Sequence, residues 1–72
     1  MHAPHELTHE EMLRLKLEVL RRKHRDLKEA IAALQAQGPN TQLTVLRFKK
    51  EKLALKDQIA RIEDELTPDI IA

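Results

Sequence analysis

The chain contains no cysteine, which excludes disulfides and thiolate-rich zinc sites and gives no sign of an oxidising compartment. Trp and Tyr are also absent, and there is one Phe, one Gly and three Pro. With 35% charged residues, this composition is typical of a long-helix or coiled-coil protein and unlike an all-β fold. The regular spacing of the apolar residues argues against disorder.

Long apolar runs are missing as well. No stretch approaches the roughly 18 apolar residues that a membrane span needs. The first twelve residues lack the apolar region of a secretory signal. We therefore expect a cytoplasmic protein with no membrane partner.

Residues suited to catalysis are scarce. The chain has neither serine nor cysteine to act as a nucleophile, and it has no glycine-rich loop to hold phosphates. A chain of 72 residues also offers little room for a concave substrate pocket. We expect a protein that is not an enzyme and that uses no cofactor.

Charge is abundant and unevenly distributed. The formal net charge is only +1. Residues 1–13 carry −3 and residues 57–72 carry −4, whereas 14–28 carry +5 and 29–56 carry +3. The middle of the chain is therefore basic and both ends are acidic.

The first predicted helix spans about residues 8–37. Thr8 and Glu11 have the spacing of a capping box, in which each satisfies a backbone N–H of the other. Gly38 and Pro39 end the helix, because proline cannot continue it. Between these limits, residues recur at alternating spacings of four and three, the rhythm of a coiled-coil seam: Leu13, Leu17, Leu20, His24, Leu27, Ile31 and Leu34.

After a turn at 38–41, a second helix is predicted over about residues 41–66. Asn40 or Thr41 is the expected N-terminal cap, and Thr67-Pro68 ends the helix. Its seam has the same rhythm and consists of Val45, Phe48, Lys52, Leu55, Ile59, Ile62 and Leu66.

Two matching seams joined by a short turn predict an all-α fold, an antiparallel two-helix coiled-coil hairpin over residues 8–67. Residues 1–7 are then a flexible, His-containing leader. Residues 68–72 form a C-terminal tail, whose Ile70 and Ile71 either fray or pack on the bundle or on a partner.

Two polar residues occupy the seam. Numbering outward from the turn pairs apolar with apolar in every layer except those of His24 and Lys52. Polar seam residues often fix the register of a coiled coil, so we interpret both as structural. Lysine can extend its ammonium group to solvent but imidazole is shorter, so we expect His24 to hydrogen-bond a partner such as Gln58 or a backbone carbonyl.

A second apolar set lies away from the seams. As wide helical faces with some exposed leucines, these residues would be ordinary. As an oligomer face, they would make the hairpin a dimeric four-helix bundle or a higher oligomer. Because a core this small rarely contributes more than about 3–5 kcal/mol, we expect a homo-oligomer. The set comprises Met12, Leu15, Val19, Leu43, Leu46 and Leu53.

Charged residues flank the seams. Toward the open end of the hairpin, the expected neighbours carry opposite charges: Arg14 with Glu63, and Lys16 with Glu65. Toward the turn they carry like charges, which repel by a few tenths of a kcal/mol per pair: Arg21 with Lys56, and Lys28 with Lys49.

The like-charged residues, with Arg25 beside them, form a candidate binding surface. We define this basic edge as Arg21, Arg25, Lys28, Lys49 and Lys56. Such a cluster suits the phosphate backbone of a nucleic acid, although Trp and Tyr are absent and the one Phe is placed in the seam, which leaves no aromatic residue for base stacking. Partners four residues away also favour a self-paired, solvated surface: Glu18–Arg22, Arg22–Asp26, Arg25–Glu29, Arg47–Glu51, Asp57–Arg61 and Arg61–Glu65.

The N-terminal residues contain three closely spaced histidines, His2, His5 and His9. Neutral imidazoles this close together can bind a transition metal. Pro4 and the helix start at Thr8, however, break any common helical face. We therefore expect a leader without a metal site.

Two segments, LRRKHRDLKEAI and FKKEKLALKDQIARI, resemble the YdcH-like family of short bacterial proteins, a domain of unknown function. The resemblance covers roughly residues 13–66. It implies a helical hairpin of bacterial origin, with no known catalytic residues and no established biochemical role. Phe48 stands where a leucine is expected, which concerns packing only.

Two functional hypotheses follow. The first is a non-enzymatic, oligomeric helical-hairpin module that acts in interaction or scaffolding and has an unknown protein partner. The alternative is a nucleic-acid-associated protein that binds the phosphate backbone through its basic edge.

Overall fold

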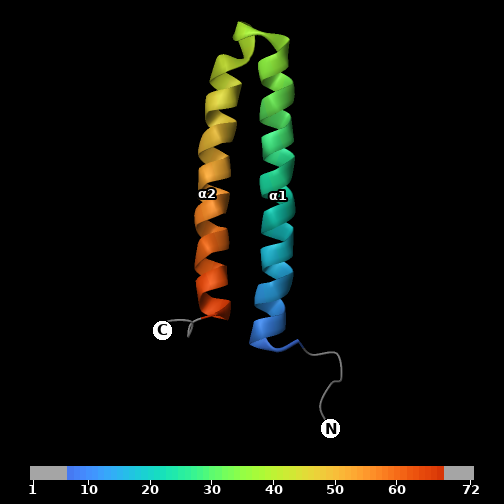
Figure 1. Cartoon of the computed structure of the whole chain (residues 1–72), viewed down its shortest axis with the longest axis vertical. Coiled ribbons are helices and arrows are strands. Elements are labelled where there is room, and N and C mark those ends of the chain that lie inside the picture. The colour runs from blue at the N-terminus through green and yellow to red at the C-terminus, as the bar shows by residue number, and fades with distance from the viewer. Residues whose placement is uncertain (1–6, 68–72) are drawn as a thin grey trace.

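The computed structural model describes residues 7–67. This part of the chain forms two long helices, α1 (His9–Gln37, 29 residues) and α2 (Gln42–Leu66, 25 residues), joined by the short 3-10 helix η1 (Pro39–Thr41). The helices lie side by side along their lengths, with the reversal at one end (Figure 1). With no strand among these residues, the fold is an all-α helical hairpin. The leader up to residue 6 and the tail from 68 lie outside the described residues.

The start of α1 is held by the predicted capping box. The Glu11 N–H donates to Thr8 Oγ1 at 3.1 Å, and the Thr8 N–H donates to Glu11 Oε1 at 2.9 Å. Two of the backbone donors that a helix leaves without partners at its start are therefore satisfied by side chains. The capping prediction is confirmed.

The end of α1 is shaped by Gly38, whose φ of +113° is accessible mainly to glycine. Thr41 follows with an unexpected role. Its hydroxyl donates to the carbonyl oxygens of Leu34 and Gly38, both at 2.9 Å, and makes no capping hydrogen bond to α2. Thr41 is the N-cap residue of α2, one of the two predicted, but its side chain does not cap the helix, because the tight turn directs its hydroxyl back to carbonyls at the end of α1 that lack helical partners.

Burial follows the two seams. Among the described residues, the buried hydrophobic side chains are Leu17, Leu20, Ile31, Val45 and Ile62, and every other seam residue is half-buried. Leu17, Leu20 and Ile62 form one cluster at the open end, packed against Leu13, Leu55, Ile59 and Leu66. This packing agrees with a register that places Leu17 opposite Ile62.

The core is loosest at mid-height. No side chain between Leu20 and Ile31 on α1, or between Val45 and Ile62 on α2, is fully buried. The polar seam residues lie in this section. An open groove of about 560 Å³ borders it and is lined by Lys23, Asp26, Leu27, Ala30, Phe48, Glu51, Ala54, Leu55 and Gln58.

His24 is half-buried in this loose section. It forms no hydrogen bond within residues 7–67, yet no buried polar side-chain atom in that range lacks a partner, so its ring nitrogens reach solvent. The expected bond to Gln58 or a carbonyl is therefore wrong. Incomplete closure of the seam lets water satisfy the imidazole instead.

Neither helix in the described part of the chain combines the length and the apolar character needed to cross a bilayer.

The turn provides a direct test of backbone strain. A Cβ added to Gly38 would meet no atom within 4 Å, so an effect of Gly38→Ala must come from the backbone conformation. Because φ +113° with ψ −173° is a region occupied almost only by glycine, we expect the free energy of unfolding to fall by about 1–3 kcal/mol. Urea denaturation followed by circular dichroism measures this change.

The matched control is Gln37→Ala, at the exposed last residue of α1, which should change stability by less than about 0.5 kcal/mol. A Gly38→Ala variant as stable as the wild type would show that the turn does not require this backbone conformation.

Candidate functional site

One ion pair joins the two helices on the side of the basic edge. The guanidinium of Arg21 donates through Nη2 to Glu63 Oε2 at 2.6 Å. Both side chains remain about half exposed, at 56% and 46%. Exposed pairs of this kind contribute about 0.2–1 kcal/mol, so the contact adjusts the alignment of the helices more than it stabilises the fold.

This pair corrects the sequence-based prediction that Glu63 pairs with Arg14. Arg14 instead donates to Glu10 on its own helix, at 2.7 Å, and leaves Glu63 to Arg21. Helical side chains tilt toward the N-terminus of their own helix. In antiparallel helices, Arg21 and Glu63 therefore tilt toward each other, whereas Arg14 tilts away toward the open end.

A second cross-helix contact lies on the other edge. His9 Nε2 lies 3.3 Å from Glu65 Oε2. Lys16, the expected neighbour of Glu65, forms no ion pair with any described residue. The sequence predicted Lys16 as the partner of Glu65, and the structure has His9 there instead.

Self-pairing within the helices is sparse. Of the spacings expected to pair, Asp57–Arg61 forms at 3.0 Å. None of the others brings its charged atoms within 4.0 Å in the described part of the chain. Exposed pairs gain too little energy to hold two long side chains in one geometry. The expectation of a largely self-paired surface is wrong, and most basic groups remain available.

The basic edge is therefore only partly neutralised. Arg21 is engaged by Glu63, but the other members have no ion-pair partner among residues 7–67: Arg25, Lys28, Lys49 and Lys56. All five basic side chains are exposed. The edge thus offers positive charge to an acidic partner.

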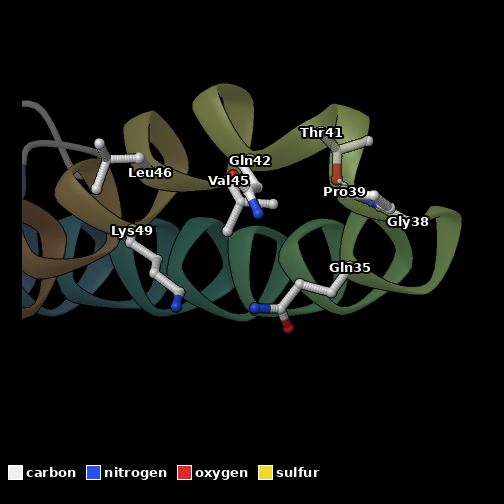
Figure 2. A pocket seen from close by; sticks show the side chains of 8 residues that line it. All are labelled: Gln35, Gly38, Pro39, Thr41, Gln42, Val45, Leu46 and Lys49. Atoms are coloured by element: carbon white, nitrogen blue, oxygen red, sulfur yellow. Dashed lines mark hydrogen bonds between the residues drawn. The ribbon is translucent and has the colours of Figure 1, made fainter.

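An open depression of about 540 Å³ lies at the turn end of this edge. Figure 2 shows the side chains of Gln35 from α1 and Lys49 from α2 extending toward one another. Val45 and Leu46 provide apolar lining beside them. The depression is open and shallow, so it presents a surface for contact rather than an enclosed site.

The outer apolar residues are exposed. The side chains of the set are between 49% and 82% accessible: Met12 54%, Leu15 51%, Val19 49%, Leu43 82%, Leu46 53% and Leu53 62%. Leu7, directly before the capping box, is 48% exposed. In the single chain, none of these side chains is covered.

The two helices present these residues on different sides. Met12 and Val19 share a depression with His9 and Lys16, on the edge of the His9–Glu65 contact. Leu46 shares its depression with Lys49, on the basic edge. Met12 and Val19 on α1 therefore border the edge opposite to that of Leu46 on α2, and Leu15 lies between the edges because it also lines a depression with Arg14 and Glu18.

No group of three His, Cys, Asp or Glu side chains within residues 7–67 is placed to hold a metal ion. Of the three N-terminal histidines, His2 and His5 lie outside the described residues. Only His9 is placed, and it lies beside Glu65.

The hairpin geometry, with its two long helices and short turn, agrees with the comparison of the sequence with family models. Residues 17–63 match the family described as "Protein of unknown function (DUF465)", the YdcH-like family of short helical proteins. The chain belongs to this family. The YdcH-like match covers most of both helices and the whole turn, and it confirms the resemblance seen in the sequence. No curated protein and no solved structure matches the chain.

The Arg21–Glu63 contact can be measured with a double-mutant cycle. Replacing each residue by alanine, alone and together, should yield a coupling free energy of about 0.2–1 kcal/mol at low salt. The coupling should decrease in about 1 M salt, because both groups are half exposed.

The cycle on Asp57 and Arg61 is the within-helix reference, with an expected coupling of about 0.3–0.5 kcal/mol. A zero coupling for Arg21 and Glu63 at low salt would mean that the cross-helix contact has no role in aligning the helices.

Proposed function

We propose that this YdcH-like chain is a non-enzymatic, homo-oligomeric helical-hairpin module that acts in interaction or scaffolding. The observation that supports it is that, within residues 7–67, seven large apolar side chains are exposed and five hydrophobic ones are buried. Apolar surface of this extent on so small a protein is typical of an interaction face. Covering it with other copies removes that surface from water.

The small core supports the same proposal. The buried residues lie toward the two ends of the seam, and the section between them contains half-buried polar groups. Two packed helices of this length bury a small fraction of their surface, and small domains commonly need oligomerisation for stability. The proposal retains the expected cytoplasmic location and an unidentified protein partner.

Light scattering coupled to size-exclusion chromatography tests the assembly. At micromolar concentration we expect a mass of at least two chains, decreasing on dilution because association follows mass action. A strictly monomeric species that remains helical by circular dichroism under the same conditions would contradict the proposal.

The alternative function is binding of a nucleic-acid phosphate backbone. It is favoured by the four basic-edge residues that have no ion-pair partner within residues 7–67. Each lysine or arginine that contacts a phosphate releases counterions, which gives affinity without sequence preference. The near-neutral net charge of +1 and the single aromatic residue favour the interaction module instead.

Fluorescence anisotropy with labelled duplex DNA and RNA discriminates between the two functions. If the basic edge binds phosphates, Lys28→Ala and Lys49→Ala should each lower the slope of log K against log salt by about 1. Arg61→Ala is the matched control, because Arg61 already pairs with Asp57. No binding at about 50 mM salt would eliminate this alternative.

A further inference from the structure

Charge is segregated along the length of the hairpin. The half nearer the turn, residues 21–56, has ten basic and three acidic residues. The described part of the open half, residues 7–20 with 57–67, has three basic and seven acidic residues. Because the chain reverses at the turn (Figure 1), the basic part of α1 lies beside the basic part of α2, and the acidic part of α1 lies beside the acidic part of α2.

The exposed apolar residues are segregated in the same way. The α1 set, Met12, Leu15 and Val19, lies in the acidic open half. The α2 set, Leu43, Leu46 and Leu53, lies in the basic turn half. Each set therefore lies in a half of the hairpin where charge of one sign predominates, although Arg14 and Lys16 also border the α1 set.

From this arrangement we infer that a second copy of the chain binds turned end for end, with the α1 set of one hairpin against the α2 set of the next. This orientation places the acidic half of each copy along the basic half of the other. The inference rests on the proposed homo-oligomeric function and specifies its interface.

Local charges around the two sets agree with this pairing. Glu11 and Glu18 are exposed beside Leu15, where Arg14 and Lys16 are also adjacent, and Lys49 and Lys50 are exposed beside the α2 set. In the inferred contact, carboxylates and ammonium groups surround a shared apolar centre, which favours this partner over a parallel copy with like charges in register.

The inferred contact joins two different surfaces, the α1 set of one copy and the α2 set of the next, and we call it head to tail in this sense. Met12 and Val19 border the edge opposite to that of Leu46, so a copy that uses its α1 set still has Leu46 exposed on the other side. An interface between two different surfaces is heterologous, and it continues to add copies until a ring closes. A two-fold dimer, by contrast, would bury the same surface on both chains.

Two substitutions separate these arrangements. Leu15→Lys places positive charge in the α1 set, facing the basic half of the partner. Leu46→Glu places negative charge in the α2 set, facing the acidic half. Each variant alone should be monomeric by light scattering and as helical as the wild type, because both positions are about half exposed.

Mixing the two variants should restore association, but only to a mass of two chains. Each variant retains one intact set, so one contact forms and the blocked surfaces prevent growth. Gln37→Lys is the matched control, since it adds a charge at an exposed site on α1 outside both sets and should assemble like the wild type.

The outcomes distinguish the inference from the proposed function. A monomeric wild type overturns the proposed homo-oligomer itself. A wild type that assembles, with a variant mixture that stays monomeric, overturns the head-to-tail contact. A single variant that assembles like the wild type also overturns it, because the substituted set is then not in the interface.

Disulfide trapping gives a second readout that does not rely on charge. The natural chain has no cysteine, so Leu15→Cys and Leu46→Cys introduce single thiols. Under mild oxidation, a mixture of the two variants should yield the disulfide that joins one variant to the other in at least about tenfold excess over either symmetric dimer. A predominance of symmetric dimers would overturn the inference.

Discussion

The apolar seam between two antiparallel helices is the constraint on which the rest of the structure depends. It aligns the helices, and through them it determines which charges become neighbours. The seam buries its side chains best near its ends, at Leu17, Leu20 and Ile62 toward the open end and at Ile31 and Val45 toward the turn. At mid-height, His24 and Lys52 replace apolar residues, the packing loosens and a groove opens. The polar residues are accommodated because the seam is open to water there, which limits the cost of burying them.

The sharp reversal at Gly38 turns a pattern along the sequence into a pattern in space. Acidic ends and a basic middle, once folded in half, become a rod with one acidic and one basic half. Few of these charges form ion pairs within residues 7–67. Two pairs join residues of the same helix, and two, Arg21–Glu63 and His9–Glu65, join the two helices. The hairpin therefore combines unpaired charge and exposed apolar groups on its outer surface. Both features support the proposed association.

Several local features were predictable because they depend on residues close in sequence. The capping box needs only Thr8 and Glu11 three positions apart, and the seams need only a regular spacing. Contacts between the helices were predicted less well. Counting residues outward from the turn predicted that Arg14 lies beside Glu63. Because helical side chains tilt toward the N-terminus of their own helix, Glu63 instead pairs with Arg21. The hydroxyl of Thr41 was assigned to the wrong helix, because the path of the turn determines which carbonyls it reaches.

The sequence by itself determined that two amphipathic helices form, where α1 begins and where the chain must turn, because hydrophobic periodicity, capping and backbone restriction act over a few residues. It also identified the residues of the outer apolar set and the basic edge. Only the tertiary structure decided which charges pair, how far the seam closes around His24, and that Met12 and Val19 border the edge opposite to that of Leu46. These properties depend on the relative position of two helices, and a spacing rule applied to one helix contains no information about the direction in which its neighbour's side chains tilt.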